Sequence, residues 1–343
     1  MENVGVKKAN LDLWSMFALA VLAGLFISLG AEFYTLVVTD TGLGFGLKKL
    51  VGGLVFSLGL ILVVIAGAEL FTGNNLIVVA WVGGKLTLGQ VMRNWVIVYL
   101  GNLVGSLGTV MLMYLTRQWA FDDYQVGVTA LNIANAKVNL SFTAGLARGI
   151  LCNVLVCLAV WLCMSSRSVT DKIMAIVFPI TAFVASGFEH SIANMYFIPM
   201  GILLKGEPQV VAAAGKVASD LANLNLNGFL SNLISVTTGN IFGGGFIVAA
   251  VYWFIYLRPR KVEGQSVVKR VLWLFLGSAN QSPNKPEYGR PNQGLWAAPA
   301  RGACSFFCRF FACVKDRLRT VFFFVGSRLS CCPWPCMWTC LQG

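Results

Sequence analysis

The sequence predicts an all-α membrane protein with several spans, and three observations support this prediction. Of its 343 residues, 57% are hydrophobic and 12% are charged, against roughly 25% charged in a soluble domain. Long uncharged stretches recur up to residue 257, and several are close to the roughly 20 residues that a helix needs to cross a bilayer. Two polar motifs also occur twice in the same order, which indicates an internal repeat.

Uninterrupted spans are expected at residues 14–38, 94–116, 141–164 and 229–257. Two further apolar runs lie between Lys49 and Lys85 and between Lys172 and Lys205. Each is too long for one straight span and has a single acid near its centre, flanked by residues that break or cap helices. We therefore expect two helices, the second and the fifth of six, to be broken at mid-membrane, which is tolerated where the freed backbone is buried or lines a cavity.

The two halves of this region resemble each other. Three spans in each half mean that the second copy enters the membrane upside down, and interrupted helices in an inverted repeat indicate a central permeation site. The glycines of the repeat allow neighbouring helices to pack closely. The matching patterns are Gly67-x-Glu69-x4-Asn74 with Gly187-x-Glu189-x4-Asn194, and Asn94-x6-Gly101-Asn102-x2-Gly105 with Asn232-x6-Gly239-Asn240-x2-Gly243.

The net charge of +12 does not indicate nucleic-acid binding, because +10 of it lies in residues 258–343. Six crossings put both termini on one side, and the basic residues of the inner segments and of the tail favour cytoplasmic termini. We expect the protein in the cytoplasmic (inner) membrane. We expect a short cytoplasmic N-terminus at residues 1–13, a six-helix channel domain at 14–258 and a basic, Cys-rich tail at 259–343. That tail is expected to be disordered or membrane-associated, and its cysteine spacing lacks the paired pattern of a zinc site.

The only histidine, His190, lies directly after Glu189 in the second broken run. Ionisable groups at membrane depth are costly and usually face a cavity, pair or perform a function. A single histidine excludes a haem site with two axial histidines and an H-E-x-x-H zinc protease. The chain has no Asn-Pro, unlike an aquaporin. We expect no enzyme activity and no cofactor, and a membrane anchor organised by the Cys-rich tail stays open as a non-transporting alternative.

Several stretches of the chain resemble the formate–nitrite transporter family, especially its bacterial formate channels. The resemblance covers about residues 4–258. It implies an aquaporin-like protomer of two inverted three-helix repeats, assembled as a homopentamer in which each protomer has its own pore. The stretches are "GLVFSLGLILVVIAGAELFTGNNLIVVA", "NWVIVYLGNLVGS", "CNVLVCLAVW" and "ASGFEHSIANMYFIPMG".

The resemblance also implies roles for individual residues. The substrate pathway would contain His190, Thr72, Lys137, Asn153 and Asn194. The apolar constrictions on either side of the histidine would be Phe56, Leu60, Leu70 and Phe183. From their position in the breaks alone, Glu69 and Glu189 are expected to order the loops by accepting freed backbone N–H groups.

The substrate is expected to be a small monovalent anion, most favourably formate, moving together with protons. Lys137 would attract the anion, and half-helix N-termini after Thr72 and Ser191 would point backbone N–H groups at it. Two schemes fit: a neutral acid permeates after protonation, or the anion passes a cationic His190. Nitrite and hydrosulfide stay open, because the segment Arg148-Gly-Ile-Leu-Cys152-Asn153 is more similar to those branches of the family.

Overall fold

The computed structural model describes residues 1–258, and this part of the chain is built from helices and their connections without a strand. The expected tail, residues 259–343, lies outside the described residues. Within residues 1–258, five helices are long and apolar enough to cross a membrane, which agrees with the predicted fold class. They are α2 (Leu13–Val37), α3 (Phe45–Ala66), α6 (Leu88–Leu115), α8 (Phe142–Cys163) and the continuous segment Leu226–Leu257, which consists of α12 (Leu226–Ile241), η4 (Phe242–Ala250) and η5 (Trp253–Leu257).

Both long apolar runs are broken where the sequence predicted. The first run stops at the end of α3 and resumes in three short pieces, α4 (Phe71–Asn74), η1 (Asn75–Ile77) and α5 (Val78–Val82). The second run is split into α9 (Val169–Ala185) and α10 (Ser191–Leu204). The first helix of each run ends next to a glycine with a left-handed backbone, Gly67 at φ 83° and Gly187 at φ 70°, a conformation that costs other residues strain.

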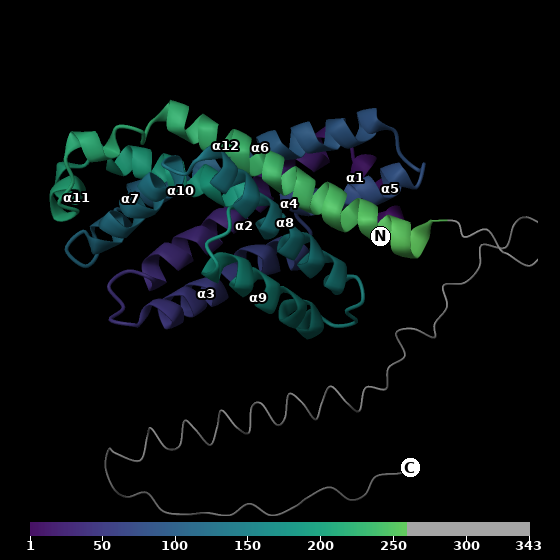
Figure 1. Ribbon diagram of the computed structural model, residues 1–343, viewed down its shortest axis with the longest axis horizontal. Coiled ribbons are helices and arrows are strands. Elements are labelled where there is room, and N and C mark those ends of the chain that lie inside the picture. Colours follow the sequence, from purple (N-terminus) through teal and green to yellow (C-terminus); the bar gives the residue numbers. More distant parts are fainter. Residues whose placement is uncertain (259–343) are drawn as a thin grey trace, which may run out of the picture. The chain divides into compact units, whose positions relative to one another are not determined.

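The inverted repeat is visible in the helix packing. Helix α2 packs on α6 in the first half, α8 packs on α12 and η4 in the second, and α3 packs on α9 between the halves (Figure 1). The two crossings depend on equivalent glycines. A Cβ added at Gly105 would lie 2.0 Å from the carbonyl oxygen of Val21, and one added at Gly243 would lie 2.2 Å from that of Ile150. Small residues at such crossings let the backbones meet.

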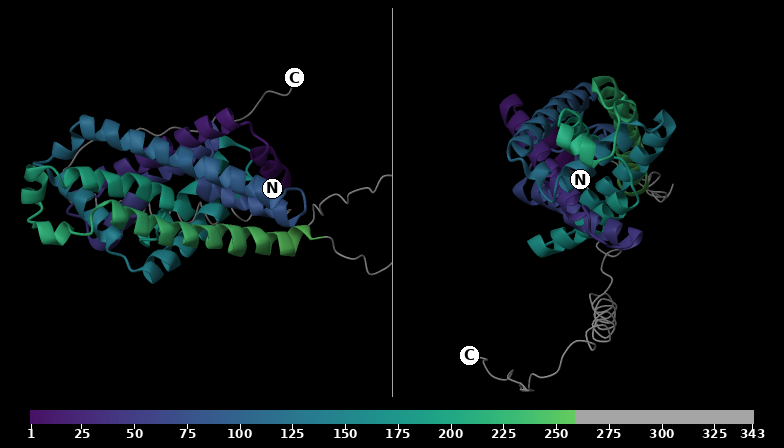
Figure 2. Two further views of the ribbon diagram at one scale, coloured as in Figure 1. Left: turned by 90° about the horizontal axis from the view of Figure 1, so that it is seen from above. Right: turned by 90° about the vertical axis from the view of Figure 1, so that its left-hand side faces the viewer.

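The repeat differs in its last helix. Helix α6 is α-helical throughout, whereas its counterpart changes to π-helix in η4 and η5. In Figure 2 both α6 and the α12–η5 segment run along the long direction of the bundle formed by residues 1–258. Extra residues in a π-helical turn change which side chains face the neighbouring helices.

Two connections between the long helices contain short helices. Residues 205–228 hold α11 (Pro208–Ala213) and η3 (Ala218–Leu221). The polar connection before residue 138 holds η2 (Gln118–Ala120) and α7 (Gln125–Val138), and α7 packs on α10. A last short helix, α1 (Glu2–Ala9), begins the chain and packs on α5, η1 and α6. These helices are short and mixed in polarity, so hydrophobicity alone does not detect them.

The backbone freed by the two breaks is held by a pair of equivalent, fully buried asparagines. Asn102 of α6 accepts from the N–H of Phe71 at 2.9 Å and donates to the carbonyl of Glu69 at 3.0 Å. Asn240 of α12 accepts from the N–H of Ser191 at 3.0 Å and donates to the carbonyl of Glu189 at 3.0 Å. Since an unpaired backbone group in a membrane protein costs several kcal/mol, these side chains make the breaks possible.

Candidate functional site

His190 connects the two broken runs at the centre of the bundle. It is the N-cap of α10, where its ring Nδ1 accepts a hydrogen bond from the N–H of Ala193 at 3.1 Å. A neutral imidazole carries one proton, so this acceptor role assigns the proton to Nε2. Nε2 lies 2.9 Å from the hydroxyl of Thr72, which belongs to α4. The structure therefore presents a neutral ring whose Nε2–H donates towards Thr72.

Apolar side chains enclose this pair on both sides. Phe183 is stacked on the His190 ring with centroids 6.0 Å apart, and Phe56 meets Phe183 edge-on at 5.7 Å. Leu60 and Leu70 are each only 2% exposed. Phe56 and Phe183 line one cavity and Leu60 and Leu70 line another. The four residues expected at the constrictions thus separate into two pairs that line two different cavities.

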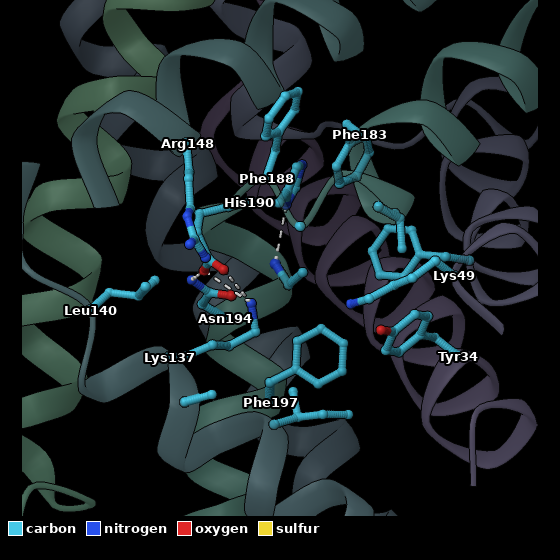
Figure 3. A pocket seen from close by; sticks show the side chains of 17 residues that line it. Tyr34, Lys49, Lys137, Leu140, Arg148, Phe183, Phe188, His190, Asn194 and Phe197 are labelled. Carbon is cyan, nitrogen blue, oxygen red and sulfur yellow. Dashed lines mark hydrogen bonds and ion pairs between the residues drawn. The ribbon is translucent and has the colours of Figure 1, made fainter. Parts of the chain in front are cut away.

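Each cavity takes its name from the lysine in it that is paired with a glutamate, Lys137 with Glu189 and Lys8 with Glu69. The Lys137 cavity measures about 210 Å³ and reaches His190 (Figure 3). The Lys8 cavity measures about 490 Å³ and is lined in part by α1 and by the break after α3. Both have room for small hydrated ions, since a water molecule occupies about 30 Å³ of liquid volume.

The ammonium group of Lys137 is hydrogen-bonded within its cavity. Its ammonium donates to both oxygens of Glu189, at 3.0 and 2.9 Å. The amide of Asn194 donates to Glu189 at 2.7 Å and to the side-chain oxygen of Asn232 at 2.8 Å, and Asn232 donates to the backbone carbonyl of Lys137 at 2.8 Å. The result is a closed ring of hydrogen bonds around a neutralised ion pair.

The same ring occurs in the Lys8 cavity. Lys8 of α1 donates to Glu69 at 2.7 Å and to the side-chain oxygen of Asn74 at 3.1 Å. Asn74 donates to Glu69 at 2.7 Å and to Asn94 at 3.0 Å, and Asn94 donates back to the carbonyl of Lys8 at 3.3 Å. The repeat thus extends to its polar contacts. The sequence analysis did not identify Lys8 as a site residue. The repeat could have indicated it, because Glu69 is equivalent to Glu189 and should have a lysine partner equivalent to Lys137.

A model of the formate/nitrite transporter family matches residues 1–254 of this chain. The chain belongs to that family. It is 48% identical over 261 residues to formate channel FocA of Escherichia coli strain K12, which covers 75% of this chain and 92% of that protein. Formate channel FocA of Haemophilus influenzae is 45% identical over 251 residues, covering 72% and 88% respectively.

Two solved structures resemble this member of the formate/nitrite transporter family. One, described as a pentameric formate channel with formate bound, is 47% identical, has a TM-score of 0.67 and covers 72% of this chain and 98% of its own. The other, described as an FNT family ion channel, is 28% identical with a TM-score of 0.63 and covers 74% and 96%.

Glu69 and Glu189 have other hydrogen-bond partners than expected. Their carboxylates were expected to accept backbone N–H groups. Within the described residues, the two carboxylates accept hydrogen bonds only from lysine and asparagine side chains. The loops are instead ordered by Asn102 and Asn240. A carboxylate beside an ammonium gains more from charge than from a backbone donor.

Asn153 and the N–H groups of the half-helices also differ from what was expected of the pathway. Asn153 donates to the carbonyl of Asn240 at 2.6 Å and lines neither of the two cavities. The first N–H groups of the half-helices are not all directed at a passing anion, because those of Phe71 and Ser191 bind the two asparagines and that of Ala193 binds His190. The ring N–H of His190 is also engaged, since it pairs with the hydroxyl of Thr72.

Proposed function

We propose that this protein is a channel for small monovalent anions, with formate as its substrate, and that it works as a homopentamer in the cytoplasmic membrane. The relatives of highest similarity reported above are named formate channels, and one related structure is described as a pentamer with formate bound. The helices of this chain are long and apolar enough for a bilayer. Nitrite and hydrosulfide are the alternative substrates.

The observation that carries this proposal is the hydrogen-bonded pair of His190 and Thr72. We propose that Phe56 with Phe183, and Leu60 with Leu70, form the apolar constrictions on either side of it. An anion that passes Phe56 and Phe183 must lose most of its water. A bare charge pays a large desolvation penalty there, whereas a neutral acid pays far less. The Nε2–H of His190 can donate a hydrogen bond to an oxygen of a substrate that reaches this pair.

The geometry favours the scheme in which a neutral acid permeates. His190 would become a cation only by taking a proton on Nδ1, and that proton would break the cap that this nitrogen forms with Ala193. The positive end of the α10 dipole lies at the same place and disfavours an added positive charge. In our proposal the anion takes its proton from the water of the cavity. The neutral acid then accepts a hydrogen bond from His190 Nε2–H and moves on past Thr72, and the ring stays neutral throughout.

The remaining residues have supporting roles in this proposal. The ion pairs of Lys137 with Glu189 and of Lys8 with Glu69 keep each cavity polar up to the constriction without adding net charge. Asn194 holds Glu189 in place. Bare ions are excluded by the four apolar side chains of Phe56, Phe183, Leu60 and Leu70.

We further infer the organisation of the whole chain. Residues 14–258 form the channel, residues 1–13 and 259–343 are cytoplasmic, and the tail is not required for conduction. The basic pairs Lys85/Arg93 and Arg167/Lys172 flank spans on the same side as the N-terminus, which supports this orientation under the positive-inside rule.

Flux of formate, nitrite and hydrosulfide, measured side by side in proteoliposomes at several pH values, tests the substrate. Formate is expected to pass fastest. If nitrite or hydrosulfide passes much faster, the substrate assignment is wrong although the family stands. If no anion passes through a protein of verified pentameric mass, the chain is a membrane anchor rather than a channel.

A further inference from the structure

The Lys137 cavity contains three donors that the protein itself does not use. Since Lys137 is saturated by Glu189, the cavity's attraction for an anion must come from elsewhere. Tyr34, Lys49 and Arg148 also line it. Among the described residues, no hydrogen bond or ion pair engages the hydroxyl, ammonium or guanidinium of these three side chains.

Tyr34 is held in position although its hydroxyl is free. Its ring meets Phe56 edge-on at 6.5 Å and Phe197 at 6.1 Å. These contacts come from two different elements, α3 and α10, and fix the ring from both sides. In Figure 3 the hydroxyl points into the cavity beside the Lys49 side chain. A fixed neutral donor is therefore available next to a cation.

Lys49 and Arg148 reach the cavity from different walls. Lys49 belongs to α3, and its ammonium lies 5.8 Å from the ring of Phe45, a contact that leaves its three donors free. Arg148 belongs to α8 and extends into the cavity from the side opposite Lys49 (Figure 3). Two cations therefore face one small volume, and Glu189, the acid that lines it, is already neutralised by Lys137.

We propose that Tyr34, Lys49 and Arg148 form a binding site for a small planar anion with two oxygens, a carboxylate or nitrite, at the entrance to the pore. This site would capture the substrate for the channel, so the proposal rests on the proposed function. The guanidinium fork of Arg148 matches two coplanar oxygens, which a spherical ion or hydrosulfide does not offer. Lys49 adds charge and Tyr34 adds one directed hydrogen bond. The three residues capture the anion before it reaches Phe56 and Phe183.

The Lys8 cavity lacks this arrangement. Apart from the Lys8–Glu69 pair, its charged lining is Lys7 and the amino group of Met1. No arginine or tyrosine of the described residues lines it, and most of its other lining residues are apolar. Charged clefts with low-dielectric walls raise the local concentration of an oppositely charged substrate, and salt weakens this effect. Capture should therefore be one-sided: strong and salt-dependent at the Lys137 cavity and weak at the Lys8 cavity.

The test uses the full chain in right-side-out and inverted membrane vesicles, with initial formate uptake measured against formate concentration at low and high salt. In one orientation, Lys49→Gln and Arg148→Gln are each expected to raise the half-saturating concentration at least about threefold at low salt and to flatten the salt dependence. Tyr34→Phe should raise it about two- to tenfold, as one neutral hydrogen bond allows. None of these changes leaves a protein group without its partner, so folding should be preserved.

Two variants make the test specific. Lys48→Gln removes the same charge from the neighbouring residue of α3, which does not line the cavity, and should behave like the unmodified protein. Arg148→Lys keeps the charge but loses the fork, so it should weaken formate uptake while leaving hydrosulfide uptake unchanged. If Lys49→Gln and Arg148→Gln match Lys48→Gln in half-saturation and salt dependence, the proposed site does not exist.

A binding measurement separates this proposal from the proposed function. Line broadening of ¹³C-formate by the purified, detergent-solubilised protein should be lost in the Lys49→Gln/Arg148→Gln double variant. A protein that conducts no formate but shows this loss would overturn the transport function and retain the site. Broadening that is equal in the double variant and the unmodified protein would overturn the site whatever the flux.

Discussion

Replacing Lys137 with methionine is expected to destabilise the protein more than any other single loss of charge at the pore. The side chains of Lys137 and Glu189 are 14% and 6% exposed, and two hydrogen bonds join them. Methionine fills similar volume but leaves the carboxylate with Asn194 as its remaining side-chain donor. Removing one partner of a buried pair costs about 3–5 kcal/mol. Because Glu189 borders a cavity that admits water, the lower end, about 3 kcal/mol, is expected.

The cause of that loss can be isolated with a second substitution. Glu189→Gln in the Lys137→Met background removes the stranded charge and keeps an acceptor for Asn194. The free energies of unfolding of the two single variants and the double variant, measured by denaturant titration in micelles, should give a coupling of about 1–3 kcal/mol. Lys48→Met is the control for a lysine without a hydrogen-bonded partner among the described residues.

The equivalent change in the other half gives an internal comparison. Lys8 is 29% exposed against 14% for Lys137, so water can replace part of what Lys8→Met removes, and a smaller loss of about 2 kcal/mol is expected. Two outcomes would refute the idea that a stranded carboxylate causes the loss of stability: a Lys137→Met protein as stable as the unmodified one, or a double variant no more stable than Lys137→Met.

Three other predictions concern the pore, the helix crossing and the tail. His190→Asn keeps a hydrogen-bonding side chain but removes the imidazole, so an assembled variant should conduct formate more slowly and keep the pH profile, because the ring stays neutral in the proposed scheme; loss of the pH dependence in stopped-flow uptake between about pH 5 and 8 would show that the ring itself titrates. Gly105→Ala places a methyl group against the carbonyl of Val21 and should destabilise the protein by about 1–3 kcal/mol, whereas Gly108→Ala, with nothing within 4 Å, should not; equal melting temperatures for the two variants would contradict the tight crossing. A chain cut after Lys261 should still insert, form pentamers and conduct, and the family model ends before that point, at residue 254; a truncated protein that expresses but sediments as monomers would show that the tail takes part in assembly.

The sequence by itself determined the helical class, the inverted repeat and the two breaks. Each depends on local information: the length of an apolar run, a glycine such as Gly67 or Gly187 that adopts a left-handed backbone, and motifs that recur in order. The repeat also paired Asn102 with Asn240, and the structure gives both the same hydrogen bonds. Family resemblance then supplied His190 and Thr72 as a pair, which lie 2.9 Å apart.

Contacts between distant segments were decided by the tertiary structure alone. Lys8 and Glu69 are 61 residues apart and meet only because α1 folds against the first break. The tautomer of His190 follows from the direction of one backbone N–H, and the free donors of Tyr34, Lys49 and Arg148 meet because α2, α3 and α8 converge on one cavity. Hydrophobicity determines which segments enter the membrane, but polar partners depend on how the helices cross and rotate, and this is set by packing over the whole bundle.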